Sequence, residues 1–368
     1  MSGLGSRAGG DPDGSPDERG KATSGVIRHQ ASLDGDDAPA GDAPPPGNRP
    51  AGRPRPLSDL LGQHRATVFP FLLIGLLLAA AAVRSPSFLS LGSLRQQLVV
   101  ASFLGVLAAG ETLVILTGGI DLSIAWNLNL SAILLTQLAE NGATATALAV
   151  ALGSAALVGL VNGLGVAYLR IPSLVMTLGM NAVLSGLTLV YTNGSPQGNA
   201  PAFARSIAVG RIAGVPYALI FWLLFGLGIV AILRRTIYGR RLYAVGNSRP
   251  ASYLSGVPVQ RTLVLTYLLC GLCAGLGGVL LTGYSAQSYL GMGDAYVLQA
   301  IAAVVIGGTS ILGGAGSYGG TVAGAIIIVL LQSVLQIVGI PYAGQQILYG
   351  LIILGTLFVY GRSARVRE

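Results

Sequence analysis

Apolar segments of membrane-spanning length recur along this chain, which limits its fold to a membrane-embedded one. A helix needs about 20 apolar residues to cross a hydrocarbon core of about 30 Å. Ten segments qualify, at residues 67–83, 97–117, 121–138, 144–168, 173–192, 214–233, 262–283, 295–309, 319–339 and 344–360. Only 10% of residues are charged, against about 25% in soluble domains. The sequence predicts an all-α polytopic membrane protein, with broken or re-entrant segments where glycines gather, as at 306–320.

The distribution of arginine predicts how these segments cross the bilayer. Ten crossings place both ends of the chain on one side. If that side is the cytoplasm, it receives thirteen arginines and the outer side receives four, as the positive-inside rule requires. We therefore expect both termini inside. The arginines lie between apolar segments rather than on one aromatic-rich face, which argues against nucleic-acid binding.

The same pattern divides the chain into three regions. Residues 1–65 are rich in Gly, Pro, Asp, Ser and Ala, and such a segment has too few large apolar groups to fold. We expect a disordered cytoplasmic tail there, a transmembrane domain at 66–361 and a cytoplasmic C-terminus at 362–368. A polar loop at 234–261 interrupts the transmembrane domain.

Catalytic motifs are missing from the chain. A P-loop requires lysine, and Lys21, in the tail, is the only lysine. His29 and His64 precede the first predicted span, so an integral-membrane enzyme would lack the His, Asp and Glu cluster it needs. Cys270 and Cys273 lie in an apolar run and are expected to be packing residues, since a redox pair needs a polar setting. We expect no catalytic residue, cofactor or metal.

The loop between the sixth and seventh predicted spans carries the signals of a short helix outside the membrane. Capping and turn residues stand near both ends of this helix: Asn247, Ser248, Pro250 and Gly256. They predict a helix at about 249–255. Tyr253 and Leu254 would offer an apolar contact to a partner protein, and an inert amphipathic surface helix is the alternative.

Five stretches resemble the permease subunits of bacterial ABC importers for ribose, xylose, arabinose and galactosides. They are TLVILTGGIDLS (112–123), TLGM (177–180), SGLTLVYTNGSP (185–196), GRRLYAVGNSRPASYLSGV (239–257) and AIAAVVIGGTSILGGAGSYGGTVAGA (300–325). Together they run through most of residues 86–361. The resemblance implies a multi-pass permease in the bacterial inner (plasma) membrane that imports a monosaccharide with energy from ATP.

Partners and a docking site follow from the same resemblance. Two cytoplasmic ATP-binding subunits, or one fused tandem, would hydrolyse ATP, and an extracytoplasmic sugar-binding protein would deliver the substrate. A second permease copy would complete a homodimer in the lipid bilayer. The family's coupling helix, which sits in a cleft of the ATPase, falls by position on Gly246, Asn247, Ala251, Leu254 and Gly256.

The translocation pathway is predicted at five polar or aromatic positions: Glu111, Asp121, Trp126, Asn127 and Asn181. Residues 124–127 depart from the family pattern after GGIDLS, and Trp126 stands where the family keeps small residues. Other roles stay open: Glu111 can form a structural pair, Asp121 can cap a helix, and asparagines can fasten helices together.

Two other functions also stay open. The same architecture could carry another polar solute, such as a nucleoside or a signalling sugar. A stand-alone ion-coupled transporter would need Glu111 and Asp121 to titrate. VILTGGIDLS (114–123) and VVIGGTSILGG (304–314) echo each other, which is typical of the internal duplication seen in many transporters.

Overall fold

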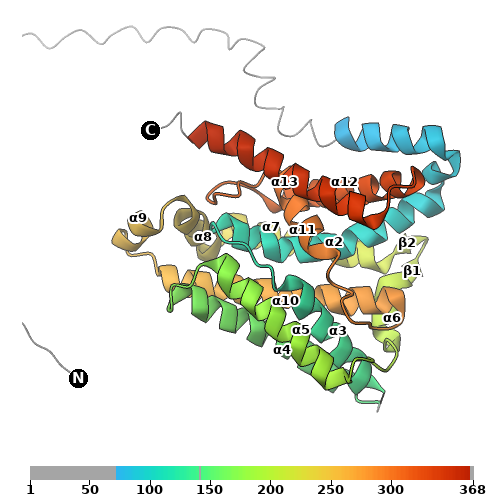
Figure 1. Ribbon diagram of the computed structural model, residues 1–368, viewed down its shortest axis with the longest axis horizontal. Helices are drawn as coiled ribbons and strands as arrows, with labels where there is room; N and C mark the ends of the chain where they lie inside the picture. Colours follow the sequence, from blue (N-terminus) through green and yellow to red (C-terminus); the bar gives the residue numbers. More distant parts are fainter. Residues whose placement is uncertain (1–71, 141, 365–368) are drawn as a thin grey trace, which may run out of the picture. The chain divides into compact units, whose positions relative to one another are not determined.

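The computed structural model describes residues 72–140 and 142–364, so the predicted tail at 1–65 lies outside the described residues (Figure 1). The helices are Leu72–Arg84, the 3-10 helix η1 (Pro86–Leu89), α2 (Leu91–Leu116), α3 (Ile124–Ala139), α4 (Thr144–Ala167), α5 (Ser173–Thr192), α6 (Ala202–Val209), α7 (Tyr217–Arg235), α8 (Ile237–Asn247), α9 (Arg249–Leu254), α10 (Val259–Ser285), α11 (Tyr296–Ile306), α12 (Tyr318–Ile337) and α13 (Tyr342–Ala364). Within the described residues, the strands are β1 (Arg211–Ile212) and β2 (Val215–Pro216), paired as an antiparallel hairpin.

Each of the ten apolar segments predicted from the sequence coincides with a helix. Six helices are long and apolar enough to cross a membrane: α2, α4, α5, α7, α10 and α12. Four shorter apolar helices account for the other segments: Leu72–Arg84, α3, α11 and the Tyr342–Phe358 part of α13. The all-α membrane class is confirmed. The number of crossings and the placement of both termini in the cytoplasm stay predictions.

Helix α10 lies inside the bundle, in contact with α2, α3, α4 and α6 (Figure 1). Its most extensive contact is with α4. A methyl group added at Gly159 would stand 2.3 Å from the Tyr267 carbonyl oxygen, and one added at Gly271 would stand 2.3 Å from the Ala155 carbonyl oxygen. Lipid gives helices no hydrophobic reason to associate, so close backbone contact through small residues supplies the attraction.

An irregular segment between α10 and α11, Ala286–Ala295, runs back alongside α3, and we call it the inserted segment. At its start, the hydroxyls of Thr136 and Ser288 are 2.7 Å apart. At its end, Gly293 lies against the carbonyl oxygen of Ala125. The two contact positions on α3, Ala125 and Thr136, are eleven residues apart, a length of about 16 Å along the helix. The inserted segment was not predicted from the sequence.

Asn129 of α3 supplies hydrogen bonds to the middle of the inserted segment. Its side-chain amide donates to the Tyr289 carbonyl at 3.1 Å and accepts from the Gly291 N–H at 2.8 Å. Irregular backbone at membrane depth needs such partners, because lipid offers none. Asn129 therefore fastens the inserted segment to α3.

Candidate functional site

The polar loop at 234–261 contains helices α8 and α9, and short polar side chains start both. The Thr236 hydroxyl accepts a hydrogen bond from the Gly239 N–H at 3.1 Å, and the Ser248 hydroxyl accepts one from the Ala251 N–H at 3.3 Å. After α9, Gly256 takes a φ of 77°, a left-handed conformation that favours glycine. The short helix predicted from the sequence is confirmed, with its cap and its terminal glycine.

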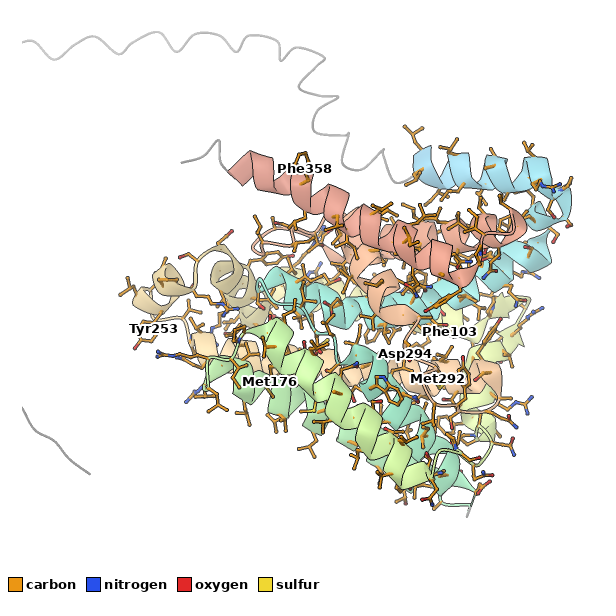
Figure 2. The ribbon with its side chains drawn as sticks, in the orientation of Figure 1. Phe103, Met176, Tyr253, Met292, Asp294 and Phe358 are labelled. Atoms are coloured by element: carbon orange, nitrogen blue, oxygen red, sulfur yellow. The ribbon has the colours of Figure 1, made fainter. Side chains whose placement is uncertain are left out.

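The tip of α9 is apolar and open. Tyr253 is 65% exposed and Leu254 is 85% exposed, and Figure 2 shows Tyr253 on the outside of α9. Arg240 and Arg241, on the preceding helix, are also exposed. The loop therefore presents two large apolar side chains near a positively charged surface.

The corner between α8 and α9 is held against two turns of the bundle. A methyl group added at Gly246 would stand 1.9 Å from the Leu116 carbonyl oxygen and 2.5 Å from the Gly314 nitrogen. The Gly314 N–H donates to the same Leu116 carbonyl at 3.0 Å. Nη2 of Arg249 donates to the Thr117 carbonyl at 3.2 Å. We call this meeting of Gly246, Arg249, Leu116, Thr117 and Gly314 the junction.

The five predicted coupling residues fall into two groups. Gly246 is part of the junction, and Oδ1 of Asn247 lies beside Gly314. Ala251, Leu254 and Gly256 are exposed on α9 and the turn after it. One group therefore fastens the loop to the bundle, and the other remains open to a partner.

The two echoing stretches of sequence fold into the same helix-ending turn. Glycines with φ of 75° and 84° end α2 and α11. The residue after each of these glycines donates its N–H to the carbonyl five residues earlier. Gly119 donates to Val114 and Thr309 donates to Val304, both at 3.2 Å. This is the Schellman pattern. The repeat is therefore present in geometry, although the second stretch has isoleucine at the position of Asp121.

Glu111 and Asp121 meet in a buried polar network after the first of these turns. The Asp121 N–H donates to Oε1 of Glu111 at 3.2 Å. Oδ1 of Asp121 accepts from the Ser123 N–H at 2.9 Å and from the Ser123 hydroxyl at 2.6 Å. Asn162 donates to the same hydroxyl at 2.8 Å, and the Cys270 thiol lies near the Asp121 carboxylate.

This network gives Asp121 a local structural role. Ser123, not Asp121, occupies the position before the first residue of α3, and its side chain caps no N–H of that helix. Asp121 instead closes the turn that leads into α3. Both Glu111 and Asp121 are at most 1% exposed, and Oε2 of Glu111 has no partner within the described residues. The pair is enclosed by helices rather than open to a surface.

The two asparagines predicted for the pathway have different surroundings. Asn127 is 1% exposed, and its Nδ2 donates to the Ala155 carbonyl of α4 at 3.2 Å. This is the pattern of an asparagine that joins helices. Asn181, on α5, is only half-buried, and its Oδ1 has no hydrogen-bond partner within the described residues.

Trp126 is brought together with Asp294, a residue that the sequence did not single out. Trp126 is half-buried in the first turn of α3 and packs near Met180 of α5. Its indole lies beside the Asp294 carboxylate. Asp294 is exposed at the end of the inserted segment, just before α11 (Figure 2). The signal in the sequence was an acid between two apolar segments, and only the inserted segment brings it to Trp126.

Comparisons with known proteins agree with the resemblance seen in the sequence. Residues 93–357 match a family described as branched-chain amino acid transport system / permease component. The ribose import permease protein RbsC of Escherichia coli K12 is 38% identical over 291 residues, 77% of this chain and 90% of that protein. RbsC of Bacillus subtilis is 37% identical over 290 residues, 77% of this chain and 89% of that protein.

A third relative is named for the import of autoinducer 2 and not of ribose. The autoinducer 2 import system permease protein LsrC of an Enterobacter strain is 33% identical over 296 residues, 79% of this chain and 85% of that protein. No solved structure matches the chain. The family match covers most of the chain and agrees with its apolar helices. The chain thus belongs to this permease-component family, together with the sugar ABC permeases, and is a multi-pass protein of the inner membrane.

Proposed function

We propose that this chain is the membrane subunit of an ATP-driven importer that carries a pentose or hexose into the cytoplasm. Its partners are two ATP-binding subunits or one fused tandem, an extracytoplasmic sugar-binding protein and a second copy of the permease. The family and the ribose permease relatives support this function. The chain has no P-loop lysine of its own, so a partner must hydrolyse ATP.

One observation carries the proposal: an exposed apolar helix that is fastened at its base to the transmembrane bundle. Leu254 is 85% exposed on α9, and Arg249 at the start of the same helix bonds to the Thr117 carbonyl. A subunit docked on Leu254 can therefore displace α9 and the junction together. An inert surface helix would have no need of this attachment.

The junction connects α9 to the start of α3. Movement of Arg249 pulls on Thr117, which lies four residues before Asp121. Asp121 is bonded to Glu111 and Ser123 on either side. Because packed elements shift as units between discrete arrangements, the turn and α3 should move as one piece with α9. In this proposal Glu111 and Asp121 transmit movement and do not titrate.

The sugar path is proposed at the side of α3 where Trp126 meets Asp294. An exposed carboxylate within a membrane domain costs about 2 to 4 kcal/mol if it faces lipid, so Asp294 should face water or a second subunit. An indole face and a carboxylate can together contact the apolar and hydroxyl faces of a sugar. Asn181, with its unpartnered Oδ1, stays a predicted pathway residue, as does Asn127.

The test is substrate-stimulated ATP hydrolysis and uptake in proteoliposomes, with and without the ATP-binding subunit. Leu254→Glu should abolish both and release the ATP-binding subunit during purification. Ile212→Glu is the matched control, since Ile212 is 55% exposed on the β1–β2 hairpin and should leave both activities unchanged. Uptake that persists without the ATP-binding subunit, driven by a pH gradient, would refute the ABC mechanism.

Substrate class is tested in the same vesicles with the cognate binding protein. Ribose, xylose, glucose, a nucleoside and autoinducer 2 are compared at equal concentration. Uptake of a pentose or hexose is expected. Uptake of the nucleoside or of autoinducer 2 alone would contradict the monosaccharide assignment while leaving the import mechanism intact.

A further inference from the structure

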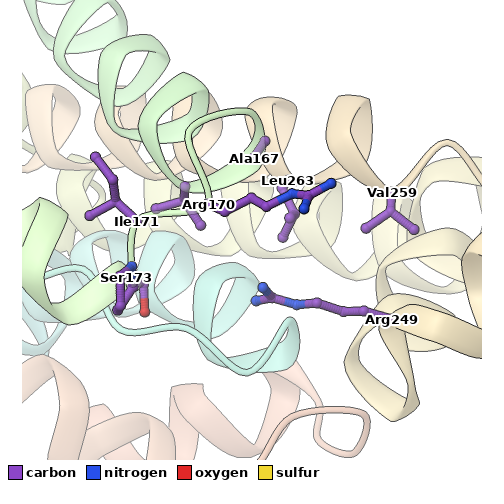
Figure 3. Close-up of a pocket in the computed structure, with 9 residues that line it drawn as sticks. Ala167, Arg170, Ile171, Ser173, Arg249, Val259 and Leu263 are labelled. Atoms are coloured by element: carbon purple, nitrogen blue, oxygen red, sulfur yellow. The ribbon is translucent and has the colours of Figure 1, made fainter. Parts of the chain in front are cut away.

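A cavity of about 330 Å³ opens beside α9, between the α4–α5 loop and the start of α10 (Figure 3). Its lining combines apolar side chains, Val166, Val259 and Leu263, with the polar side chains of Arg170, Arg249 and Ser173. In Figure 3 the side chains of Arg170 and Arg249 extend into the same space from opposite sides. None of the functional assignments above uses this cavity.

The cavity holds positive charge that no acid within the described residues neutralises. Arg170 makes no hydrogen bond or ion pair with any described residue, and Arg249 makes a single one, to the Thr117 carbonyl. A guanidinium has five N–H donors, so most donors of both side chains remain available. Of the two buried acids, Glu111 accepts from the Asp121 N–H and Asp121 accepts from Ser123.

The start of α5 adds to the positive potential. The 20-residue helix begins at Ser173 in the cavity wall, and the preceding residue, Pro172, supplies no side-chain cap. The first N–H groups of a helix have no partner within it and attract anions. Two arginines and an uncapped helix start thus line one space.

Exposed apolar side chains stand next in sequence to the residues that line the cavity. Tyr168 is 58% exposed and Leu169 is 73% exposed just before Arg170, and Leu174 and Val175 are 49% and 61% exposed just after Ser173. An aromatic next to aliphatic groups at the end of transmembrane helices is typical of the lipid–water interface. The ligand is therefore expected to have an anionic part and an apolar part.

We propose that this cavity is a binding site for the phosphate of an anionic phospholipid. The guanidinium groups of Arg170 and Arg249 bind the phosphate oxygens, and the acyl chains lie along Leu169 and Leu174. Guanidinium and phosphate form paired, charge-assisted hydrogen bonds, and basic pockets between transmembrane helices on the cytoplasmic side bind lipid headgroups. Because Arg249 also belongs to the junction, the bound lipid would stiffen the corner that holds α9.

The test measures lipid binding by the purified full chain alone, so it does not depend on the proposed transport function. The delipidated protein in neutral detergent is titrated with phosphatidylglycerol, with phosphatidylcholine and with inorganic phosphate, and bound lipid is counted by native mass spectrometry. We expect phosphatidylglycerol to be retained. Phosphatidylcholine and inorganic phosphate should each bind with an affinity at least roughly tenfold lower.

Variants then assign the binding to the cavity. Arg170→Gly should weaken phosphatidylglycerol binding roughly tenfold yet fold normally, because Arg170 has a φ of 57° that glycine adopts without strain. Arg249→Gln should give a similar loss. Arg241→Gln is the control, since Arg241 is exposed on α8 and does not line the cavity.

Two results would overturn the proposal. Equal retention of phosphatidylglycerol by wild type and Arg170→Gly, or an equal loss in Arg241→Gln, would show that the cavity is not the site. Inorganic phosphate competing as strongly as phosphatidylglycerol would show that the cavity takes a soluble phosphate and not a lipid.

Discussion

Gly246→Ala is the sharpest test of the junction, because the geometry leaves no space for the added methyl. The new carbon would stand 1.9 Å from the Leu116 carbonyl oxygen. Ordinary contact begins at 3.4 Å, so α8 must move away from the end of α2 by about 1.5 Å. The Gly314 nitrogen would also stand 2.5 Å from the same carbon, so a sideways shift of α8 does not relieve the clash.

The expected destabilisation follows from two losses. Forcing a methyl into a filled site costs about 1 to 3 kcal/mol. Separating the Gly314 N–H from the Leu116 carbonyl leaves buried backbone groups unpaired, at about 1 to 3 kcal/mol. We expect the free energy of unfolding to fall by roughly 2 to 6 kcal/mol, with the strain concentrated where α9 joins the bundle.

The assay compares thermal unfolding, ATP-binding-subunit copurification and uptake for Gly246→Ala and Gly228→Ala. Gly228 is also a helical glycine, on α7, but a methyl there meets nothing within 4 Å. The control should keep wild-type uptake and melting temperature. Gly246→Ala should melt at a lower temperature and lose uptake more than it loses ATP-binding-subunit association. Wild-type uptake and melting in Gly246→Ala would refute the close approach on which the junction is based.

Three further predictions rest on single contacts. Asn129→Leu should lower the melting temperature, because two backbone groups of the inserted segment lose their hydrogen-bond partners. Each loss costs about 1 to 3 kcal/mol. An unchanged melting curve would contradict the role assigned to Asn129. Asp294→Asn should raise the KM for sugar uptake several-fold while leaving membrane insertion and basal ATP hydrolysis unchanged, and an unaltered KM would remove this residue from the pathway. Gly271→Ala should destabilise the bundle by about 1 to 3 kcal/mol, because the added methyl would stand 2.3 Å from the Ala155 carbonyl oxygen. Thermal unfolding measures this loss. Normal stability would show that α4 and α10 can separate freely.

Local signals were enough to predict the helices and the coupling loop. Apolar runs of membrane length located every major helix, because the bilayer sets their composition and length independently of packing. Capping residues predicted α9, since Ser248 and Gly256 act within a few residues of their own position. The glycine-rich family motifs identified the family, and the comparison over residues 93–357 agrees.

The candidate site depended on contacts between residues far apart in the sequence. Trp126 was predicted for the pathway, but its neighbour Asp294 is 168 residues away and reaches it only through the inserted segment. An irregular segment has no periodic pattern, so a sequence reading takes it for an ordinary connecting loop.

The sequence by itself determined which segments form apolar helices and which loop between them is polar, because hydropathy and charge act residue by residue. Only the tertiary structure decided that GGIDLS leads into a closed carboxylate network, that Gly246 fastens α8 to α2 and that two arginines share one cavity. Those three arrangements depend on which backbone segments pack against one another. That closeness is a property of the packed helices together and not of any one segment.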